Sequence, residues 1–502
     1  MLNSEMRSAR SASIFVRDSL PVIQRIVTKI PADEHRRLKI LAENLVRDEP
    51  ALTSTEFFGD RVVTGIADDR PAVVLADHSE ISLYDRRGEM SLEYRMLLLA
   101  QRGDLAIIGA QRSADFEKYC REKLGLGRVE VLALPDTGNR AQSGPARRCR
   151  TNAAIMTTLA HTARLHDGLT ILPYMGTREV WMLAAEIAKR AGVTVHVAAP
   201  PPRLTRRVND KIWFASRVRD VLGPGALPPS FSTFGPAALA ARVAYLARHN
   251  QQVVVKLPDS ASGSGNLVLP ADDLRGMPLS ELRQTLINLL EGLGWHGTYP
   301  LLAGVWDAPV LANPSVQLWV PLGEDGPPIV EGLFDQRIEG PQARFVGASL
   351  SRLPVEWQER IAGEAARLAY LFQQLGYYGR CSLDVVLVGE TLENASLHWI
   401  ECNGRWGGTS LPMTIANRLL PEWGKGAALI VQRPLHFNAT RRFADVAERL
   451  ESKLLSIGHR DKGTVFLSPG GLEDGTGLNF LVFADTDAQA DAYCQAVIEA
   501  VQ

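Results

Sequence analysis

The stretch CSLDVVLVGETLENASLHWIECNGR, residues 381–405, holds two apolar runs joined by a polar connection. The runs 381–389 and 396–404 have the length and composition of β-strands. We expect them to pair as an antiparallel hairpin, because the polar segment between them is short enough to reverse the chain. The hairpin ends in charged and amide side chains, which makes it the first place to look for chemistry.

Side chains alternate between the two faces of a strand. Glu401 and Asn403 should therefore share one face, while Ile400 and Cys402 point to the other. If the two runs pair, Asp384 lies beside Glu401 and Asn403. The pattern thus predicts two carboxylates and one amide oxygen at one place on the sheet.

Oxygen donors of this kind suit magnesium, so Asp384, Glu401 and Asn403 are the candidate metal ligands. Arg405 follows where the chain leaves the strand, and its guanidinium could hold a phosphoryl or carboxylate group with two hydrogen bonds. The alternative is a polar sheet face with a surface ion pair. That alternative is less favoured, because two acids on one face repel each other unless a cation lies between them.

A second candidate is VVVKLPDSASGSGNLVL, residues 253–269, which reads as strand, Gly/Ser loop and strand. Lys256 ends the first strand, and the small residues 263–265 let backbone N–H groups approach an anion. On this segment alone, a hairpin turn with a surface lysine is the favoured interpretation. A dinucleotide-binding fingerprint is excluded, since Val268 stands at the third glycine position and an apolar strand follows.

A third segment is Asn209-Asp210-Lys211, which follows the proline-rich break PPPR at 200–203 and opens an amphipathic helix over 210–223. By itself it indicates an N-cap, because Asn and Asp satisfy free N–H groups there.

Around these segments the chain divides into three parts. Before the break, short apolar runs alternate with helical patterns, which predicts a mostly parallel sheet with helices on its faces. After it, three runs look like antiparallel strands and 356–376 like a long helix. From about 435 the pattern is helix, strand, strand, helix. The predicted runs of the first part are 72–77, 105–110, 129–135, 169–174 and 193–200, with helices at 33–46 and 177–192; the later strands are 315–323, 328–338 and 343–349.

The composition is that of a globular protein. The 502 residues are 46% hydrophobic and carry a net charge of −1, which excludes a disordered chain and gives no indication of nucleic-acid or membrane binding. Five scattered cysteines argue against disulfides or structural zinc and favour a cytoplasmic location. We find no signal-peptide core and no apolar run near the ~20 residues that a membrane span needs.

The three segments occur in the order and spacing of the ATP-grasp superfamily, which the chain resembles over about 205–430. Within it, PSVQLWVPLG (314–323), FDQRIEGPQARFVGA (334–348) and ECNGRWGGTSLP (401–412) are similar to peptide ligases of the pheganomycin-biosynthesis type. The resemblance implies a mixed α/β and α+β fold in three domains: a Rossmann-like pre-ATP-grasp domain with a helical extension (1–203), a two-lobed ATP-grasp domain (204–432) and a small α+β domain (433–502).

The resemblance also implies roles for the residues. Lys211 and Lys256 would contact ATP phosphates, and Arg405 would hold the γ-phosphate or an acyl phosphate. Mg²⁺ would be bound by Asp384, Glu401 and Asn403. The catalytic candidates are Arg405 and Lys256. The nucleotide-binding set adds the Gly/Ser loop, which is the natural lid: Ser260, Ser262, Gly263, Ser264 and Gly265.

Two positions depart from the family pattern. Gly404 stands where an apolar residue is common, and Leu411 where a histidine is expected. Both lie next to the substrate side, so they concern the choice of substrate more than ATP binding. The adenine hinge should fall near 303–307.

The expected activity is an ATP-dependent carboxylate–amine ligase that forms an amide bond through an acyl phosphate and releases ADP and phosphate. Its partners would be a small-molecule carboxylate, such as an amino acid, and an amine or peptide acceptor, with a homodimer as the expected assembly. Two alternatives stay open. A kinase of the same fold would need no amine, and a nucleotide-binding protein without activity would not need the intact charges at Lys256, Asp384, Glu401 and Asn403.

Overall fold

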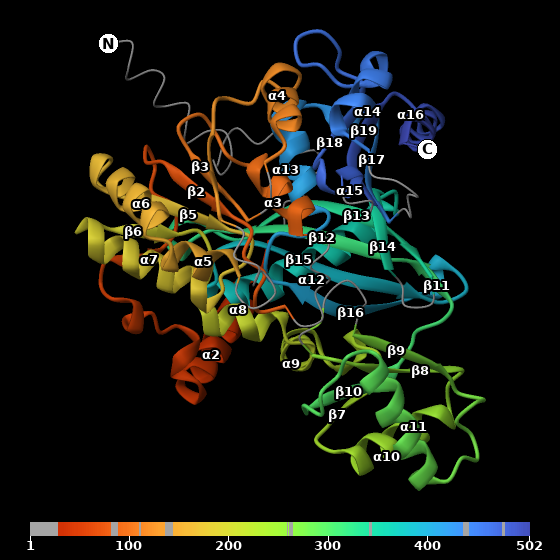
Figure 1. Cartoon of the computed structure of the whole chain (residues 1–502). Helices are drawn as coiled ribbons and strands as arrows, with labels where there is room; N and C mark the ends of the chain where they lie inside the picture. The colour runs from red at the N-terminus through yellow and green to blue at the C-terminus, as the bar shows by residue number, and fades with distance from the viewer. Residues whose placement is uncertain are drawn as a thin grey trace.

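The protein is described from a computed structural model, which covers residues 29–81, 89–109, 112–135, 144–258, 260, 265–340, 344–434, 441–473 and 477–501. Three sheets organise these residues (Figure 1). Within the described part of the chain, no helix has both the length and the apolar character needed to cross a membrane.

The first sheet is parallel throughout, as predicted, with strand order β1-β6-β5-β2-β3-β4. Its central strands are fully buried because helices cover the sheet. Thr177 caps the N-terminus of α7, and Gly192 ends that helix in the left-handed region at φ 76°. The strands are β1 (Val62–Thr64), β2 (Ala72–Leu75), β3 (Leu105–Ile108), β4 (Glu130–Ala133), β5 (Leu169–Pro173) and β6 (Val195–Val197), and the helices are α3 (Glu89–Leu97), α4 (Ala114–Glu122), α5 (Pro145–Thr151), α6 (Ala153–Leu165) and α7 (Arg178–Ala191). The preceding helix, α2 (Ala32–Asp48), packs instead on α12 (Val355–Gln374) of the third sheet.

Two short helices, α8 (Pro202–Asn209) and α9 (Lys211–Leu222), connect the parallel sheet to the rest of the chain. The predicted N-cap is confirmed: the Asp210 carboxylate accepts hydrogen bonds from the backbone N–H groups of Ile212 (2.8 Å) and Trp213 (3.2 Å). This cap fixes the angle between the two helices and thereby the position of Lys211.

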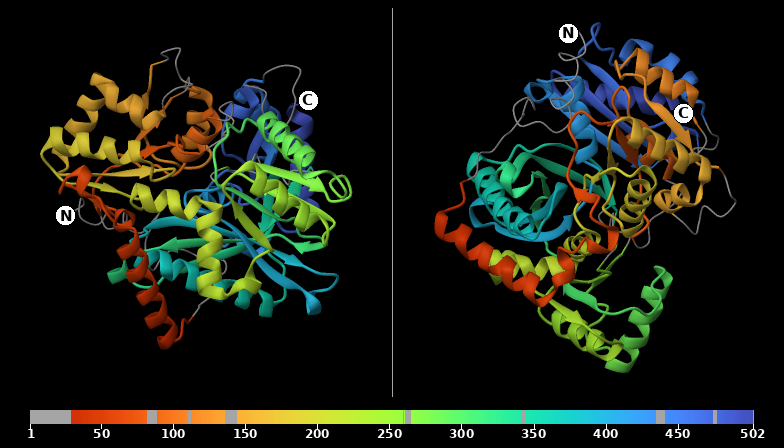
Figure 2. Two further views of the ribbon diagram at one scale, coloured as in Figure 1. Left: turned by 90° about the horizontal axis from the view of Figure 1, so that it is seen from below. Right: turned by 90° about the vertical axis from the view of Figure 1, so that its left-hand side faces the viewer.

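The second sheet is small and antiparallel, with order β7-β10-β8-β9. Leu282, Leu286 and Leu290 recur at helical spacing on α11 and pack with α10 against alternate residues of β8 and β10. This lobe projects from the molecule in the right-hand view of Figure 2. Its elements are β7 (Ser230–Thr233), α10 (Pro236–Ala247), β8 (Gln252–Lys256), β9 (Asn266–Pro270), α11 (Leu279–Gly292) and β10 (Leu301–Val305).

The third sheet has nine strands, and its pairings are antiparallel. The long helix α12 covers one face through Ile361, Ala365, Leu368 and Phe372. Its strands are β11 (Val310–Ala312), β12 (Pro314–Val320), β13 (Ile329–Glu339), β14 (Arg344–Leu350), β15 (Gly379–Val388), β16 (Ser396–Asn403), β17 (Ala427–Pro434), β18 (Gly463–Phe466) and β19 (Gly477–Ala484), with α12 (Val355–Gln374), α13 (Ser410–Leu419), α14 (Phe443–Arg449), α15 (Gly470–Glu473) and α16 (Asp487–Val501).

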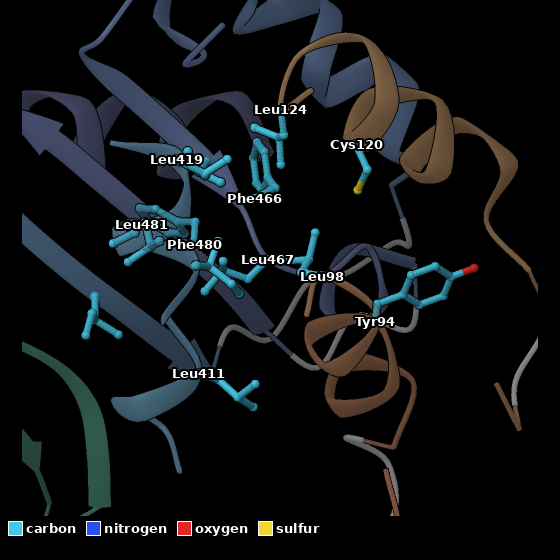
Figure 3. Close-up of a cluster of buried hydrophobic side chains, with 14 of the residues drawn as sticks. Tyr94, Leu98, Cys120, Leu124, Leu411, Leu419, Phe466, Leu467, Phe480 and Leu481 are labelled. Atoms are coloured by element: carbon cyan, nitrogen blue, oxygen red, sulfur yellow. The ribbon is translucent and has the colours of Figure 1, made fainter. Parts of the chain in front are cut away.

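The C-terminal strands share a hydrophobic core with helices of the N-terminal part (Figure 3). Phe466 and Phe480 from β18 and β19 lie in one cluster with Leu98 and Leu124. The Tyr119 hydroxyl accepts a hydrogen bond from the Phe466 backbone N–H at 3.2 Å. Segments more than 300 residues apart in the sequence are therefore packed together. The mixed α/β fold with a parallel N-terminal sheet, predicted from the sequence, is confirmed.

Candidate active site

The predicted hairpin is confirmed as the antiparallel pair β15 and β16. Asp384 lies directly opposite Glu401, and Ser382 opposite Asn403. The register shifts by one residue between Asp384 and Val385, so a bulge interrupts the alternation of β16. The expectation that Ile400 points away from Glu401 is therefore wrong: both residues line the same cavity.

Asp384 is held by two hydrogen bonds. Its Oδ1 accepts from the Ser315 hydroxyl at 2.6 Å, and its Oδ2 accepts from the Asn403 amide at 2.9 Å. Burial, together with the negative charge of Glu401, raises the pKa of Asp384 to about 7 despite these bonds. Near pH 7 this carboxyl group is therefore divided between its protonated and ionised forms, and a bound cation would favour the ionised form.

Glu401 is paired with Lys211, whose Nζ lies 3.0 Å from the Glu401 Oε2. Burial opposes ionisation of Glu401, but Lys211, Arg405 and Lys256 outweigh it and hold the pKa of this carboxyl below its usual value. The Lys211 ammonium also donates to the Ser260 carbonyl at 2.7 Å. Helix α9, the Gly/Ser loop and β16 therefore meet at one cation.

Lys256 ends β8, as predicted, and only 7% of its surface is exposed. Burial lowers the pKa of Lys256 to about 8, with Glu401 opposing the shift and Lys211 adding to it. Its Nζ lies 5.7 Å from the centre of the Trp306 ring. The group is a largely desolvated cation, which is a strong binding partner for a phosphate.

Arg405 is held between two asparagines. Its Nη2 donates to the Asn403 Oδ1 at 2.7 Å, and its Nη1 donates to the Asn209 Oδ1. Its Nε is buried and has no hydrogen-bond partner among the residues that the structure describes. A buried donor of this kind is costly unless a ligand satisfies it.

Lys211, Lys256, Asp384 and Glu401 line a cavity of about 200 Å³ between the small sheet and the nine-stranded sheet, whereas Asn403 and Arg405 lie behind its lining residues. Its lining combines charged residues, namely Lys211, Lys256, Asp307, Asp384 and Glu401, with apolar and uncharged polar ones. The remaining lining residues are Pro228, Ser260, Asn266, Val305, Trp306, Val310, Asn313, Gln336, Ile338, Val385, Val386 and Ile400. These residues offer partners both for an apolar ring and for a polyanionic group.

The Gly/Ser loop is described in part. Ser260 is buried, and its hydroxyl donates to the Leu257 carbonyl at 3.1 Å. The Gly265 carbonyl accepts from the Leu257 N–H at 3.0 Å, which closes the loop at its base. Ser262, Gly263 and Ser264, which we expect to bind nucleotide, lie outside the described residues.

The fold also brings in residues that the sequence interpretation did not single out. Asp307 follows β10 at the predicted hinge, and its Oδ2 lies 2.9 Å from the Nδ1 of His398 on β16. Trp306 and Gln336 also line the cavity. Only the hinge position signalled Asp307. His398 lies on the predicted strand β16 and Gln336 on β13, but no local pattern brings either strand to the hinge.

The site is suited to magnesium by its donor set. Asp384 and Glu401 are opposite each other, and the Asn403 Nδ2 donates to the Asp384 Oδ2, while the Asn403 Oδ1 accepts from Arg405. All three side chains carry a hard oxygen atom. Burial and then the charge of Glu401 raise the pKa of Asp384, and a divalent cation would favour its ionised form. Their assignment as ligands stays a prediction.

Both departures from the pattern that the resemblance implies have a packing reason. A Cβ at Gly404 would collide with the Val208 side chain and lie 2.9 Å from the Asn209 Nδ2. Leu411 is completely buried in the core that the C-terminal strands share with α3 and α4 (Figure 3).

Comparison with known proteins agrees with this architecture. Residues 93–189 match the family model of the Pre ATP-grasp domain. Comparison with curated protein sequences gives no match.

Solved structures are similar over most of the chain. N5-carboxyaminoimidazole synthase from Aspergillus clavatus, solved with ADP, is 15% identical at a TM-score of 0.50, covering 88% of this chain and 99% of that one. A biotin carboxylase from Campylobacter jejuni is 12% identical at a TM-score of 0.51, covering 89% and 92%. The biotin carboxylase domain of the Hydrogenobacter thermophilus 2-oxoglutarate carboxylase is 12% identical at 0.50, covering 86% and 89%. At this identity the likeness shows the fold, an ATP-grasp architecture with a parallel-sheet domain in front of it.

Proposed function

We propose that the protein is an ATP-dependent carboxylate–amine ligase that forms an amide or peptide bond. The observation that carries the proposal is the cavity between the two antiparallel sheets. Two buried lysines, Lys211 and Lys256, face two carboxylates, Asp384 and Glu401, on its walls. This arrangement fits a nucleoside triphosphate with bound magnesium, which brings negative and positive charge together, better than it fits an anion or a cation alone.

In this proposal a substrate carboxylate attacks the γ-phosphate of ATP to give an acyl phosphate and ADP, and an amine then displaces phosphate. Lys256 and Lys211 bind phosphate oxygens, and the Arg405 Nε satisfies its missing hydrogen bond on the transferred group. Bound magnesium would neutralise phosphate charge, held by Asp384, Glu401 and Asn403. The side chains chiefly position and neutralise the reactants, because phosphoryl transfer leaves little covalent work for them.

The apolar part of the cavity is the proposed adenine site, with Trp306 and Ile400 beside the hinge. Acyl phosphates hydrolyse readily, so water must be excluded while the amine binds. The Gly/Ser loop is proposed as the lid, since its base is fixed by Leu257 and Gly265.

Among ATP-grasp ligases we propose the pheganomycin-type peptide ligases as the nearest kind, on the strength of the segments 314–323, 334–348 and 401–412. An amino acid or related carboxylate and an amine or peptide acceptor are then the substrates. The domain limits 1–203, 204–432 and 433–502, a homodimer and a cytoplasmic location belong to the same proposal. The strand β17 runs across the second limit and pairs with both β14 and β19.

The test is an ADP-release screen of amino acids and short peptides in pairs, with mass spectrometry of the products. We expect ADP, phosphate and a condensed product that needs both partners. AMP as the stoichiometric nucleotide product would contradict the proposal. A phosphorylated product that accumulates without any amine would favour a kinase instead.

A further inference from the structure

Asn209, the last residue of α8, makes four hydrogen bonds with its side-chain amide. Its Oδ1 accepts from the Gly404 N–H at 3.0 Å and from the Arg405 Nη1. Its Nδ2 donates to the carbonyls of Thr205 at 2.7 Å and Gly404 at 3.3 Å. Two donors face the oxygen and two acceptors face the nitrogen, so the amide has one satisfactory orientation.

These bonds fix Arg405 at both ends. Asn209 holds Nη1 and Asn403 holds Nη2, while the Gly404 backbone that precedes Arg405 is clamped through both its N–H and its carbonyl. The guanidinium is planar, so fixing both terminal nitrogens also fixes the direction of the Nε–H. That is the donor left without a partner among the described residues.

Gly404 is part of the same arrangement. A side chain there would occupy the space that Val208 and Asn209 fill, so α8 could not approach the end of β16. An apolar residue at this position would exclude Asn209 from its four bonds. The glycine that departs from the family pattern is therefore what admits Asn209.

The segment that carries Asn209 also carries Lys211, which pairs with Glu401. Asn209 and Lys211 flank Asp210, the N-cap of α9. Asn209 bonds to Arg405, which lies four residues after Glu401, the partner of Lys211. The connection formed by α8 and α9 therefore contacts both strand β16, which carries the proposed metal ligands, and the proposed phosphate-binding Arg405.

We infer that Asn209 is a positioning residue for Arg405: it orients the guanidinium so that the Nε edge meets the γ-phosphate. Gly404 makes this contact sterically possible, because it has no Cβ to displace Asn209. This inference rests on the proposed function for the identity of the anion. The orientation of Arg405 itself can be tested without any nucleotide.

The first experiment is a crystal structure of Asn209→Ala without ligands. We expect the backbone of α8 and β16 to stay in place and the Arg405 guanidinium to leave its position or to become spread over several rotamers. An unchanged, well-ordered Arg405 would overturn the inference. This result does not depend on whether the protein is a ligase.

The second experiment compares ATP and ADP binding by calorimetry in magnesium. Asn209→Ala should lose about tenfold in ATP affinity and little in ADP affinity, because only ATP carries the γ-phosphate. In an Arg405→Ala background the same change should cost nothing further. An equal loss in both backgrounds, or an equal loss for ATP and ADP, would mean that Asn209 is only structural and would overturn the inference.

Asn250→Ala is the matched control. The Asn250 amide donates to the Leu246 carbonyl four residues earlier at 2.8 Å, the same local bond that Asn209 makes to Thr205, and it lies beside α10 in the small-sheet lobe. It should bind both nucleotides like the wild type. If the wild type binds neither ATP nor ADP, the proposed function fails, and the crystal structure of Asn209→Ala still decides the positioning role.

Discussion

At Lys256 the fold places an ammonium group where little water reaches it. Burial brings its pKa to about 8, so the group is mainly charged at pH 7 and loses its charge as the pH rises through that value. A bound phosphate would stabilise the charged form. The benefit of the lysine to ATP binding is therefore greatest below pH 8.

Lys256→Ala should weaken ATP binding by about tenfold to hundredfold at pH 7, the loss expected for a charge-assisted interaction of ~1.5–3 kcal/mol. The wild-type affinity should fall between pH 7 and 10, and the variant's affinity should fall less. Calorimetric titration at several pH values measures both effects. Lys189→Ala, at an exposed position of α7, is the control, and unchanged affinity in Lys256→Ala would contradict a phosphate contact.

Asp384 and Glu401 lie opposite each other at the proposed metal site. The pKa of Asp384 is raised to about 7, so protons compete with magnesium below that pH. Metal affinity should therefore rise with pH across this range. Part of this rise in the pKa of Asp384 comes from the negative charge of Glu401, and a neutral side chain at position 401 would remove that part.

Glu401→Gln should weaken magnesium binding at pH 8 and move its pH dependence to lower pH, because Asp384 then ionises more easily. Magnesium titration of the ADP complex between pH 5.5 and 8.5 measures both effects. Activity should fall at limiting magnesium and recover in part at high magnesium. Glu422→Gln, on an exposed residue, should change neither; full activity of Glu401→Gln at limiting magnesium would refute the ligand assignment.

At the scale of elements, the site depends on how segments approach one another. Ser260 of the Gly/Ser loop accepts a hydrogen bond from the Lys211 ammonium through its backbone carbonyl. A Cβ at Gly265 would overlap the Ser260 side chain and lie 3.1 Å from the Leu257 Cβ. Glycine is needed at position 265 because its backbone lies against the buried side chains of Ser260 and Leu257, with no room for a Cβ between them.

Gly265→Ala should displace Ser260 and cost about 1–3 kcal/mol of stability, the usual range for overpacking. ATP affinity should fall with it, because Lys211 loses the carbonyl that positions it. Urea unfolding and ATP titration measure the two losses. Gly235→Ala is the matched control: its backbone is extended at φ 177°, and no atom lies within 4 Å of its added Cβ. Equal behaviour of the two variants would contradict the close approach.

At the scale of the whole molecule, one core joins the parallel-sheet part to the C-terminal strands. Phe466 is fully buried, and its ring lies 5.5 Å from that of Phe443 and 6.2 Å from that of Phe480. Helices α3 and α4 contribute to the same cluster (Figure 3). The parallel-sheet part and the C-terminal strands should therefore lose structure together.

Phe466→Ala should cost about 3–5 kcal/mol, because it leaves a cavity in this shared core. The loss should appear in limited proteolysis of both the N-terminal and the C-terminal parts, at the same urea concentration. Phe234→Ala removes a ring that is 75% exposed and should change stability by less than about 0.5 kcal/mol. Cleavage confined to the C-terminal part would show that the parallel-sheet part and the C-terminal strands unfold independently.

Local pattern was sufficient for much of the fold. The apolar runs of the N-terminal part, the helix at α12 and the hairpin β15–β16 were all predicted, because each is decided by periodicity and by the turn residues between runs. The pairing of Asp384 with Glu401 followed from the hairpin. The bulge at Ile400 did not, because the register of a strand depends on its neighbours as well as on alternation.

What the sequence by itself determined was therefore the class of the fold and the chemistry of the candidate residues: oxygen ligands on one hairpin, a lysine at a strand end and a Gly/Ser loop. What only the tertiary structure decided was which groups meet. Lys211 reaches Glu401 across 190 residues, and Asn209 reaches Arg405 across 196. No local signal encodes such contacts, because they depend on the packing of three sheets, and that packing also sets the burial that shifts the pKa values of Lys256 and Asp384.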